Sequence, residues 1–492
     1  MAMNRRSVLR AAALGVALSV VDLGALSGCM PESAAGQVDW NALRQALAGA
    51  LILPADTDYA SAKLAYNPRF DDRKPAAIAR CANVSDVQRC VAVAAESDVR
   101  IAARSGGHSY AGYSTPDGGL IADVGPMNSV QVAADGTAVI GAGARLMDVY
   151  SGLARAGRCL PGGSCPTVGI AGLTLGGGLG VLTGKYGLTC DSLLSAQVVT
   201  ADGVLRTASA ESEPELYWAL RGGGGGNLGV VTSFTFRTVA APQLAVFQLR
   251  FPAGAFTEVM GGWQSFTQSA PDEFWSTLGV SAGNPPTCRI NGCYVGSESD
   301  LNTLVDKLIA ATGCQPSNRY SLSKDYLSAM MYFGGCANYT AEQCHPSWNG
   351  AGVLGRESFM ASSRVLTGPL SDPGKLTALL TGRTGMDILL DSLGGAASRI
   401  GVADTAFPHR EALATAQIYV GATTPDARAG VGEVRDALGD LTGNTAYVNY
   451  IDQDLGNWAD AYYGGNAPRL RRTAQKYDPH NVFAFDQSVT KC

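Results

Sequence analysis

Hydrophobic and polar residues alternate with two different periods along the first half of the chain, and these periods predict its elements. Short apolar runs bounded by turn residues predict strands at residues 76–81, 100–104, 119–124 and 137–144. Apolar residues at helical spacing predict helices at 84–98 and 145–157, and Ser85 is a candidate N-cap of the first. The elements follow one another irregularly rather than in strict alternation, which indicates an α+β fold.

Further along the chain the pattern continues and then changes. Residues 193–209 predict a hairpin turning at Asp202-Gly203, and residues 215–239 predict a helix, a glycine loop and a strand. Near Ala240 the glycine clusters thin out, and longer strands and helices follow. This change predicts a domain boundary, and the regions that we expect after the N-terminal signal are residues 37–240, 241–440 and 441–492.

The N-terminal residues resemble an export signal. Arg5 and Arg6 precede an apolar run at residues 11–21, about half of the ~20 residues that a bilayer-spanning helix needs. The paired arginines resemble a twin-arginine signal, so we predict that residues 1–36 direct export, with an ordinary amphipathic helix as the alternative. Residues 26–29 also resemble a lipoprotein cleavage site, which leaves a lipid anchor at Cys29 open.

Composition excludes several classes of protein. The 492 residues are 46% hydrophobic and carry a net charge of −5 without any block of like charges, so we expect a globular monomer that binds no nucleic acid. No later run is apolar enough to span a membrane, and no CxxC or HExxH spacing supports a metal site. Export would permit disulfides among the twelve cysteines. Cys336 and Cys344 lie close together in a loop, although sequence alone leaves the pairing open.

Glycine clusters carry the first chemical signal. They occur at Ser105-Gly106-Gly107, at Gly176-Gly177-Gly178 and at residues 222–226. Glycine turns leave backbone N–H groups pointing outward, where they bind anions. Three such turns in one half of the chain indicate a ligand with phosphates and extended planar parts. The GxGxxG fingerprint of the Rossmann fold is not present in its usual setting, so this nucleotide fold is of another type.

These turns belong to longer motifs that resemble a known family. "RSGGHSY" (104–110), "GGSCPTVGIAGLTLGGGLG", "RGGGGGNLGVVTSF" and the C-terminal "YVNYIDQDL" and "KYDPHNVF" resemble the berberine-bridge-enzyme-like flavin oxidases. The resemblance runs from about Pro75 to the C-terminus. It implies an α+β protein with a two-subdomain FAD-binding domain of the vanillyl-alcohol-oxidase type at 37–240. It also implies an α+β substrate domain with a large antiparallel sheet at 241–440 and a segment at 441–492 that returns to the FAD domain.

The resemblance also implies which residues hold FAD. His108 matches a histidine that bonds covalently to the flavin 8α carbon, and Cys165 matches a cysteine that bonds to flavin C6. Imidazole and thiolate are good nucleophiles, and the flanking glycines leave room for both to reach the ring. The alternatives are a hydrogen-bonded turn residue for His108 and a buried thiol or half of a disulfide for Cys165. The other expected cofactor contacts are Arg104, Ser105, Gly106, Gly107, Ser109, Gly169, Gly172, Gly176, Gly177, Gly178, Gly226, Asn227, Gly229, Val231 and Asn481.

Tyrosines are the expected catalytic groups. Oxidation of an alcohol needs a base, and the resemblance assigns it to Tyr450, with Tyr447 nearby and Tyr110 as a further active-site tyrosine. Positions i and i+3 of a strand face opposite ways, so Tyr447 and Tyr450 need a bulge or turn to face the flavin together; core packing is the alternative for each. In relatives a carboxylate from the substrate domain assists, and the sequence does not locate it. Among the histidines, His409 is a candidate base without further support.

The motifs therefore predict an exported FAD-dependent oxidase. It would remove a hydride from a C–OH carbon of a sugar, oligosaccharide or secondary metabolite, and O2 would reoxidise the flavin to give H2O2. C–N oxidation of a cyclic amine is the alternative, because Leu173 stands where many sugar-oxidising relatives carry histidine and "GIAGLTLGGGLG" also resembles hydroxynicotine oxidases. A flavin-loaded surface binding protein is a third hypothesis.

Overall fold

The computed structural model describes residues 38–492 except residues 98, 349 and 351. The predicted export signal at 1–36, with Arg5, Arg6 and Cys29, lies outside the described residues. Within the described residues, no helix is both long and apolar enough to cross a membrane. The strands of this part of the chain form two sheets in its first half, a large sheet in its second half and a short pair.

The first sheet leads into the glycine turn at Ser105-Gly106-Gly107. Its strands, in spatial order, are β1 (Ala50–Ile52), β2 (Ala77–Arg80), β4 (Leu120–Asp123) and β3 (Ile101–Arg104). Strands β2, β4 and β3 run parallel, so their carboxyl ends share one edge, and Arg104 stands opposite Asp123 there. In open sheets with parallel strands, ligands bind outside this edge. The turn containing His108 therefore leaves the sheet where a ligand is expected.

Helix α3 (Val84–Ser97) begins at the predicted residue, but Ser85 is not its N-cap. Ser85 lies inside the helix, and the side chain of Asn83 accepts the N–H of Asp86 at 3.0 Å in its place. The fully buried carboxylate of Asp86 in turn accepts three backbone N–H groups, from Ala48, Gly49 and Ala82. This carboxylate joins the start of the helix to the residues just before β1, so Asp86 also fixes the sheet edge.

The second sheet and its helices complete the first half. Its strands, in spatial order, are β5 (Val130–Val132), β6 (Thr137–Gly141), β10 (Val230–Arg237), β8 (Leu193–Val199) and β9 (Leu205–Ser209). The predicted hairpin at 193–209 is confirmed as β8 and β9, which pair antiparallel. The short pair is β7 (Arg158–Cys159) with β11 (Val239–Ala240). The helices here are α1 (Trp40–Ala46), α2 (Tyr59–Ala62), α4 (Leu146–Arg155), α5 (Ile170–Leu175), α6 (Thr183–Tyr186) and α7 (Pro214–Ala219).

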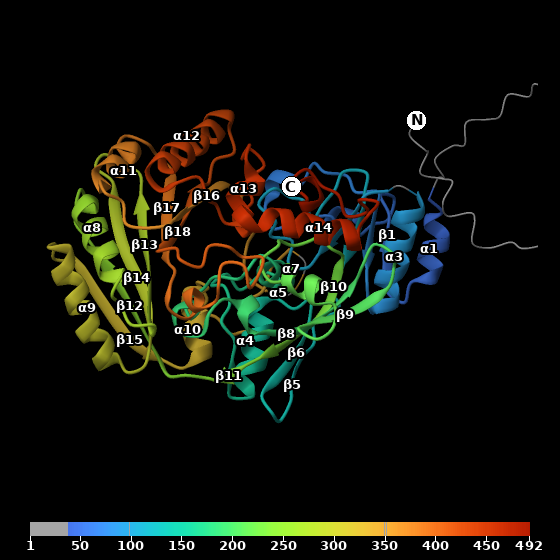
Figure 1. The fold of residues 1–492 in the computed structure, drawn as a ribbon, viewed down its shortest axis with the longest axis horizontal. Coiled ribbons are helices and arrows are strands. Elements are labelled where there is room, and N and C mark those ends of the chain that lie inside the picture. Colours follow the sequence, from blue (N-terminus) through green and yellow to red (C-terminus); the bar gives the residue numbers. More distant parts are fainter. Residues whose placement is uncertain (1–37, 98, 349, 351) are drawn as a thin grey trace, which may run out of the picture. The chain divides into compact units, whose positions relative to one another are not determined.

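The second half is built on a large antiparallel sheet, as predicted (Figure 1). Its strands, in spatial order, are β15 (Asn318–Lys324), β12 (Leu244–Arg250), β14 (Thr287–Val295), β13 (Phe274–Ser281), β17 (Met386–Ser392), β18 (Ala414–Val420) and β16 (Met360–Leu366). Figure 1 shows its helices along the outer side of the sheet: α8 (Phe256–Thr267), α9 (Glu298–Thr312), α11 (Pro373–Leu380) and α12 (Pro425–Thr442). Helix α10 (Tyr326–Phe333) lies nearer the first half.

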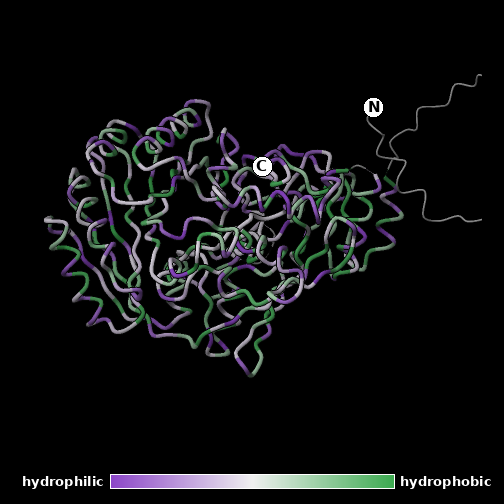
Figure 2. Tube along the Cα trace, in the orientation of Figure 1, coloured by the Kyte–Doolittle hydropathy of each residue, from purple (hydrophilic) through white to green (hydrophobic). Residues whose placement is uncertain are grey.

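The two faces of this sheet have different characters because its strands alternate. Along β18, Ala414, Ala416 and Ile418 are buried among the helix residues, and Thr415, Gln417 and Tyr419 point to the opposite face. Figure 2 shows hydrophobic and hydrophilic residues interleaved along the chain in this way. Burying a residue such as Ile418 contributes about 1.5–3 kcal/mol to stability. The helices therefore pack on the apolar face of the sheet, and the polar face is free to contact other parts of the protein or a ligand.

The C-terminal segment packs with the first half. It contains the 3₁₀ turn η4 (Val448–Tyr450) and the helices α13 (Trp458–Tyr463) and α14 (Ala467–Tyr477). Leu470 and Ala474 of α14 are buried in the same core as Ala77 and Val230. All the described residues cluster as one unit, so the boundaries at 240 and 440 stay predictions.

Candidate active site

Two glycines bring the His108 turn against the Cys165 segment. A Cβ atom on Gly106 would lie 2.3 Å from the backbone nitrogen of Gly169, so only glycine permits this contact. Gly107 has φ +72°, a left-handed conformation that other residues rarely adopt. Together they let the chain pass from β3 into a turn whose backbone packs directly on residues 167–169.

His108 is held in its neutral form. Its Nε2 lies 2.9 Å from Oγ1 of Thr167, and its ring stacks on Tyr66 with centroids 4.0 Å apart. Burial, with a smaller contribution from the charge of Arg145, lowers the pKa of His108 to about 3. An unprotonated imidazole keeps a nitrogen lone pair, so His108 is chemically suited to act as a nucleophile.

Cys165 lies next to the same threonine. Its Sγ is 3.5 Å from Oγ1 of Thr167, and the cysteine forms no disulfide within residues 38–492 as the structure describes them. Burial raises the pKa of the Cys165 thiol, and hydrogen bonds from Thr167 and Val168 act in the opposite direction. The two residues that the motifs single out are therefore joined through one hydroxyl group.

A cavity of about 460 Å³ extends from this turn. The predicted site residues that line it are Ser105, Gly106, Gly107, His108, Ser109, Tyr110, Gly169, Gly172, Gly226, Asn227, Gly229, Val231 and Tyr450. Sequence reasoning missed others in the same wall, among them Tyr113, Asn449 and Gln487. Tyr113 and Gln487 come from connecting segments and Asn449 from the turn η4, and no local pattern separates them from ordinary turn or core residues.

Several predicted cofactor contacts lie away from this cavity lining. A Cβ on Gly176 would be 2.1 Å from the side chain of Asn449, and one on Gly178 would be 2.3 Å from that of Thr189. These glycines, with Gly177 between them, allow close packing of the protein on itself. Asn481 is exposed in a turn with φ +56°. Cys165 is likewise outside the lining and meets it through Thr167.

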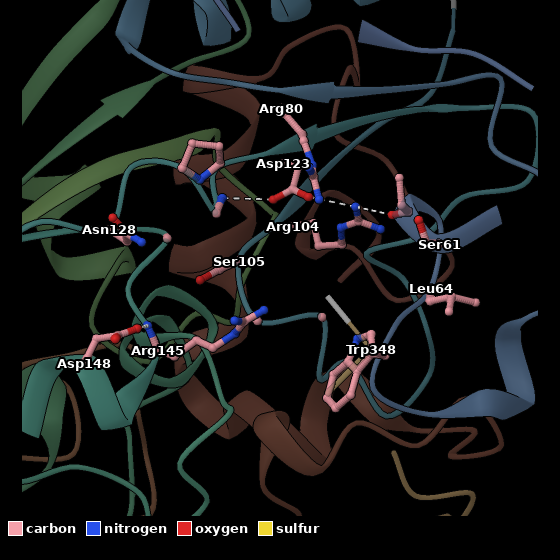
Figure 3. A pocket seen from close by; sticks show the side chains of 16 residues that line it. Ser61, Leu64, Arg80, Arg104, Ser105, Asp123, Asn128, Arg145, Asp148 and Trp348 are labelled. Carbon is pink, nitrogen blue, oxygen red and sulfur yellow. Dashed lines mark hydrogen bonds and ion pairs between the residues drawn. The ribbon is translucent and has the colours of Figure 1, made fainter. Parts of the chain in front are cut away.

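Arg104 lies next to the glycine turn, on the side away from the larger cavity. Its guanidinium forms an ion pair with Asp123 at 2.7 Å and donates to the carbonyl of Ala62 at 2.7 Å. Figure 3 shows Arg104 and Asp123 in the wall of a second, polar pocket of about 250 Å³, with Arg145 and Trp348 also lining it. This pocket shares Ser105, Gly106 and Gly107 with the larger cavity. Arg104 therefore supports the glycine turn instead of lining the larger cavity.

The two C-terminal tyrosines come together because they lie in a turn. Tyr450 ends the 3₁₀ helix η4 and Tyr447 precedes it, and residues three apart eclipse in such a helix. Their ring centroids are 5.1 Å apart. Tyr447 is 2% exposed, and its hydroxyl oxygen accepts the N–H of Gly178 at 3.0 Å and the amide of Asn449 at 2.8 Å. Tyr447 thus fixes the local backbone, while Tyr450 faces the cavity.

Tyr110 connects the glycine turn to the large sheet. Its ring stacks on that of Tyr450 with centroids 5.5 Å apart and planes within 16°. Its hydroxyl accepts a hydrogen bond from Nε2 of Gln417 at 2.6 Å. Phe359 packs edge-on against the same ring at 4.9 Å. The polar face of the sheet therefore meets the tyrosines of the first half at this point.

Asp391 is a half-buried carboxyl on the same sheet face. It stands opposite Thr277 on β13 and Thr415 on β18. Burial raises the pKa of Asp391 to about 6, and the negative charge of Asp391 raises the pKa of Tyr450 and of Tyr110. The sequence did not single out this carboxyl. The alternation in "MDILLDS" marks its face, but a solvent-facing strand has the same pattern.

The other histidines are occupied elsewhere. His409 is 8% exposed and does not line the cavity, and burial lowers its pKa to about 4, so it is neutral and enclosed. Nε2 of His345 lies 2.8 Å from Oδ1 of Asp148 on α4. His345 follows the disulfide between Cys336 and Cys344, a pairing that the sequence had left open. Neither His345 nor His409 is therefore placed to act as a base in the cavity, where Tyr110 and Tyr450 lie.

The cavity fits FAD by its chemistry. Gly172 and Gly226 line it, and a Cβ atom at either would meet no atom within 4 Å, so a ligand can approach the bare backbone there. Gly107 supplies the left-handed residue of an anion-binding turn at the carboxyl edge of the first sheet. The fold and this cavity define an FAD-binding flavoprotein with a separate large antiparallel sheet.

Comparison with known proteins identifies the family. The domain family described as "FAD binding domain" matches residues 75–209, and "Berberine and berberine like" matches residues 446–490. An FAD-linked oxidoreductase of Bacillus subtilis is 32% identical over 90% of this chain and 97% of its own length. The chitooligosaccharide oxidase of Gibberella zeae is 30% identical over 86% and 89%. The structure of Physcomitrella patens BBE-like 1 superposes with TM-score 0.84 at 30% identity, covering 91% and 98%. The chain belongs to the berberine-bridge-enzyme-like FAD-linked oxidoreductases.

Proposed function

We propose that this protein is an exported FAD-dependent oxidase that takes a hydride from a C–OH carbon of a sugar, oligosaccharide or secondary metabolite. The observation that carries the proposal is the cluster of Tyr450, Tyr110, Gln417 and Asp391, which meets the glycine-lined cavity beside His108. The similarity to a chitooligosaccharide oxidase supports an oligosaccharide as the substrate class. Dioxygen is the electron acceptor in this proposal and leaves as hydrogen peroxide.

Bound FAD supplies the hydride acceptor, and the protein must move the hydroxyl proton. We assign the base to Tyr450, which faces the cavity. A buried tyrosine holds its proton strongly, because burial and the charge of Asp391 both raise its pKa. Asp391 therefore takes the phenol proton as Tyr450 accepts the proton of the substrate hydroxyl. A carboxyl with a pKa of about 6 is ionised at neutral pH yet still basic enough to serve.

His108 and Cys165 are the residues that we propose to hold FAD covalently. The neutral imidazole and the position of Cys165 on the other side of Thr167 support two bonds. Acid denaturation of wild-type protein should leave the yellow colour on the polypeptide, with a mass one FAD above that of the mature chain. His108→Ala should keep the flavin through Cys165, and release of the flavin by this single change would mean one bond only.

The N-terminal motif supports export by the twin-arginine route. Replacing both Arg5 and Arg6 with lysine should leave the protein inside the cell, since the route reads the arginine pair. Secretion of the variant at the wild-type level would refute this route.

Leu173 supports one second candidate, C–N oxidation of a cyclic amine. It lines the cavity with an apolar side chain where many sugar-oxidising relatives carry histidine. A panel of oligosaccharides, simple alcohols and cyclic amines, assayed for peroxide, separates the two functions. Peroxide from an alcohol supports the first proposal. Turnover of amines with none of the alcohols would overturn it in favour of the second.

A further inference from the structure

Thr167 stands between the two residues that we propose as covalent tethers. Its Oγ1 is 2.9 Å from Nε2 of His108 and 3.5 Å from Sγ of Cys165. The residue is 2% exposed, and its backbone carbonyl lies 2.9 Å from the position of a Cβ on Gly106. The close packing of the glycine turn therefore fixes where this hydroxyl sits.

A threonine hydroxyl has one hydrogen to donate and two lone pairs that accept. If Nε2 of His108 carries the imidazole hydrogen, it donates to Oγ1, and the hydroxyl hydrogen remains available for Sγ of Cys165. Nδ1 then keeps its lone pair. If Nδ1 carries the hydrogen instead, Oγ1 must donate to Nε2, and the sulfur loses its donor. Only the first arrangement prepares both nucleophilic atoms at once.

We propose that Thr167 is a positioning residue that couples the two tethers, holding His108 as its Nε2–H tautomer while donating a hydrogen bond to Cys165. This inference rests on the proposed bicovalent attachment of FAD. The donated hydrogen bond favours the thiolate, which is the nucleophilic form of cysteine. It also opposes the effect of burial, which raises the pKa of the Cys165 thiol.

The chemistry of attachment balances with dioxygen as the oxidant. Each bond replaces one hydrogen on the side chain and one hydrogen on the flavin. Two electrons and two protons leave for each bond, and O2 takes them to become H2O2. Thr167 is regenerated, because it only exchanges hydrogen-bond partners.

The matched variants are Thr167→Val, which keeps the shape without the hydroxyl, and Thr167→Ser, which keeps the hydroxyl. Thr174→Val is the control, because the hydroxyl of Thr174 is buried without a hydrogen-bond partner. Each protein is purified with FAD, denatured and digested, and mass spectrometry measures the flavin on the His108 and Cys165 peptides. Melting temperature and total FAD report folding and binding separately.

We expect Thr167→Val to lower the flavin on the Cys165 peptide by at least about tenfold, because a hydrogen bond to a charged group is lost. Thr167→Ser should restore it, and Thr174→Val should match wild type. Equal attachment in Thr167→Val and wild type would overturn the inference. If Thr167→Val does not fold, Thr167→Ala against Thr167→Ser makes the same comparison. Wild type decides the underlying proposal first: flavin absent from either peptide of wild type refutes bicovalent attachment and this coupling with it.

Discussion

Replacing Asp391 with asparagine should make the protein more stable and less active. Burial raises the pKa of Asp391 from 3.8 to about 6, so this carboxyl holds its proton more strongly in the folded protein than in the unfolded chain. At about 1.36 kcal/mol per pKa unit, keeping this group ionised costs about 3 kcal/mol of folding free energy. The cost is absent below pH 3.8, grows up to about pH 6 and is fully present above it.

Asparagine is a neutral group of the same shape and removes this cost. The melting temperature of Asp391→Asn should therefore exceed that of wild type at about pH 8, and the difference should vanish near pH 4. Thermal unfolding of the purified FAD-loaded proteins at these two pH values measures both. Asp387→Asn is the matched control, since Asp387 lies four residues earlier on β17 and is not part of the proposed proton path.

Activity should change in the opposite direction. Without the carboxylate, Tyr450 has no group to receive its proton, so kcat/KM should fall by about 10²–10⁴. Wild-type kcat/KM should fall about tenfold per pH unit below about 6 as Asp391 is protonated, and this limb should be missing in the variant. A variant with wild-type activity and the same acid limb would refute the role of Asp391.

Three further substitutions test Tyr450, Tyr447 and the buried ion pair between Arg410 and Asp191. Tyr450→Phe should lower kcat by at least about 10²-fold in the peroxide assay while the melting temperature holds, because the ring can still stack on Tyr110. Tyr447→Phe should destabilise the fold by about 1–3 kcal/mol in thermal unfolding, because the buried N–H of Gly178 loses its acceptor. Arg410→Met should cost about 3–5 kcal/mol by the same measurement, since it leaves Asp191 buried without its ion-pair partner. An unchanged value in any of these assays would contradict the contact concerned.

Local pattern was enough to predict several elements of the first half and its glycine turn, although not β1, β5 or α5. The strands and helices around β2, α3 and β4 follow from residue periodicity within short windows, and the left-handed Gly107 follows from its place in "SGGHS". The position of the His108 turn was predictable because it directly follows strand β3, whereas the contacts of His108 with Tyr66 and Thr167 come from distant segments.

Contacts between distant segments were not predictable. Gln417 reaches Tyr110 across 307 positions, and Asp391 depends on the register of β13, β17 and β18. Gly176, Gly177 and Gly178 as cofactor contacts stay a prediction. A packing glycine has the same sequence signature as a ligand-binding one, and the sequence did not show that a Cβ at Gly176 or Gly178 would meet Asn449 or Thr189.

Anaerobic reduction followed by reoxidation tests the central claim most directly. Purified FAD-loaded protein is mixed with an oligosaccharide without oxygen, and its yellow absorbance is followed. The account predicts that the colour bleaches, that it returns when O2 is admitted, and that one H2O2 appears for each carbonyl formed. Failure of every alcohol to bleach the flavin, while a cyclic amine does so, would contradict it.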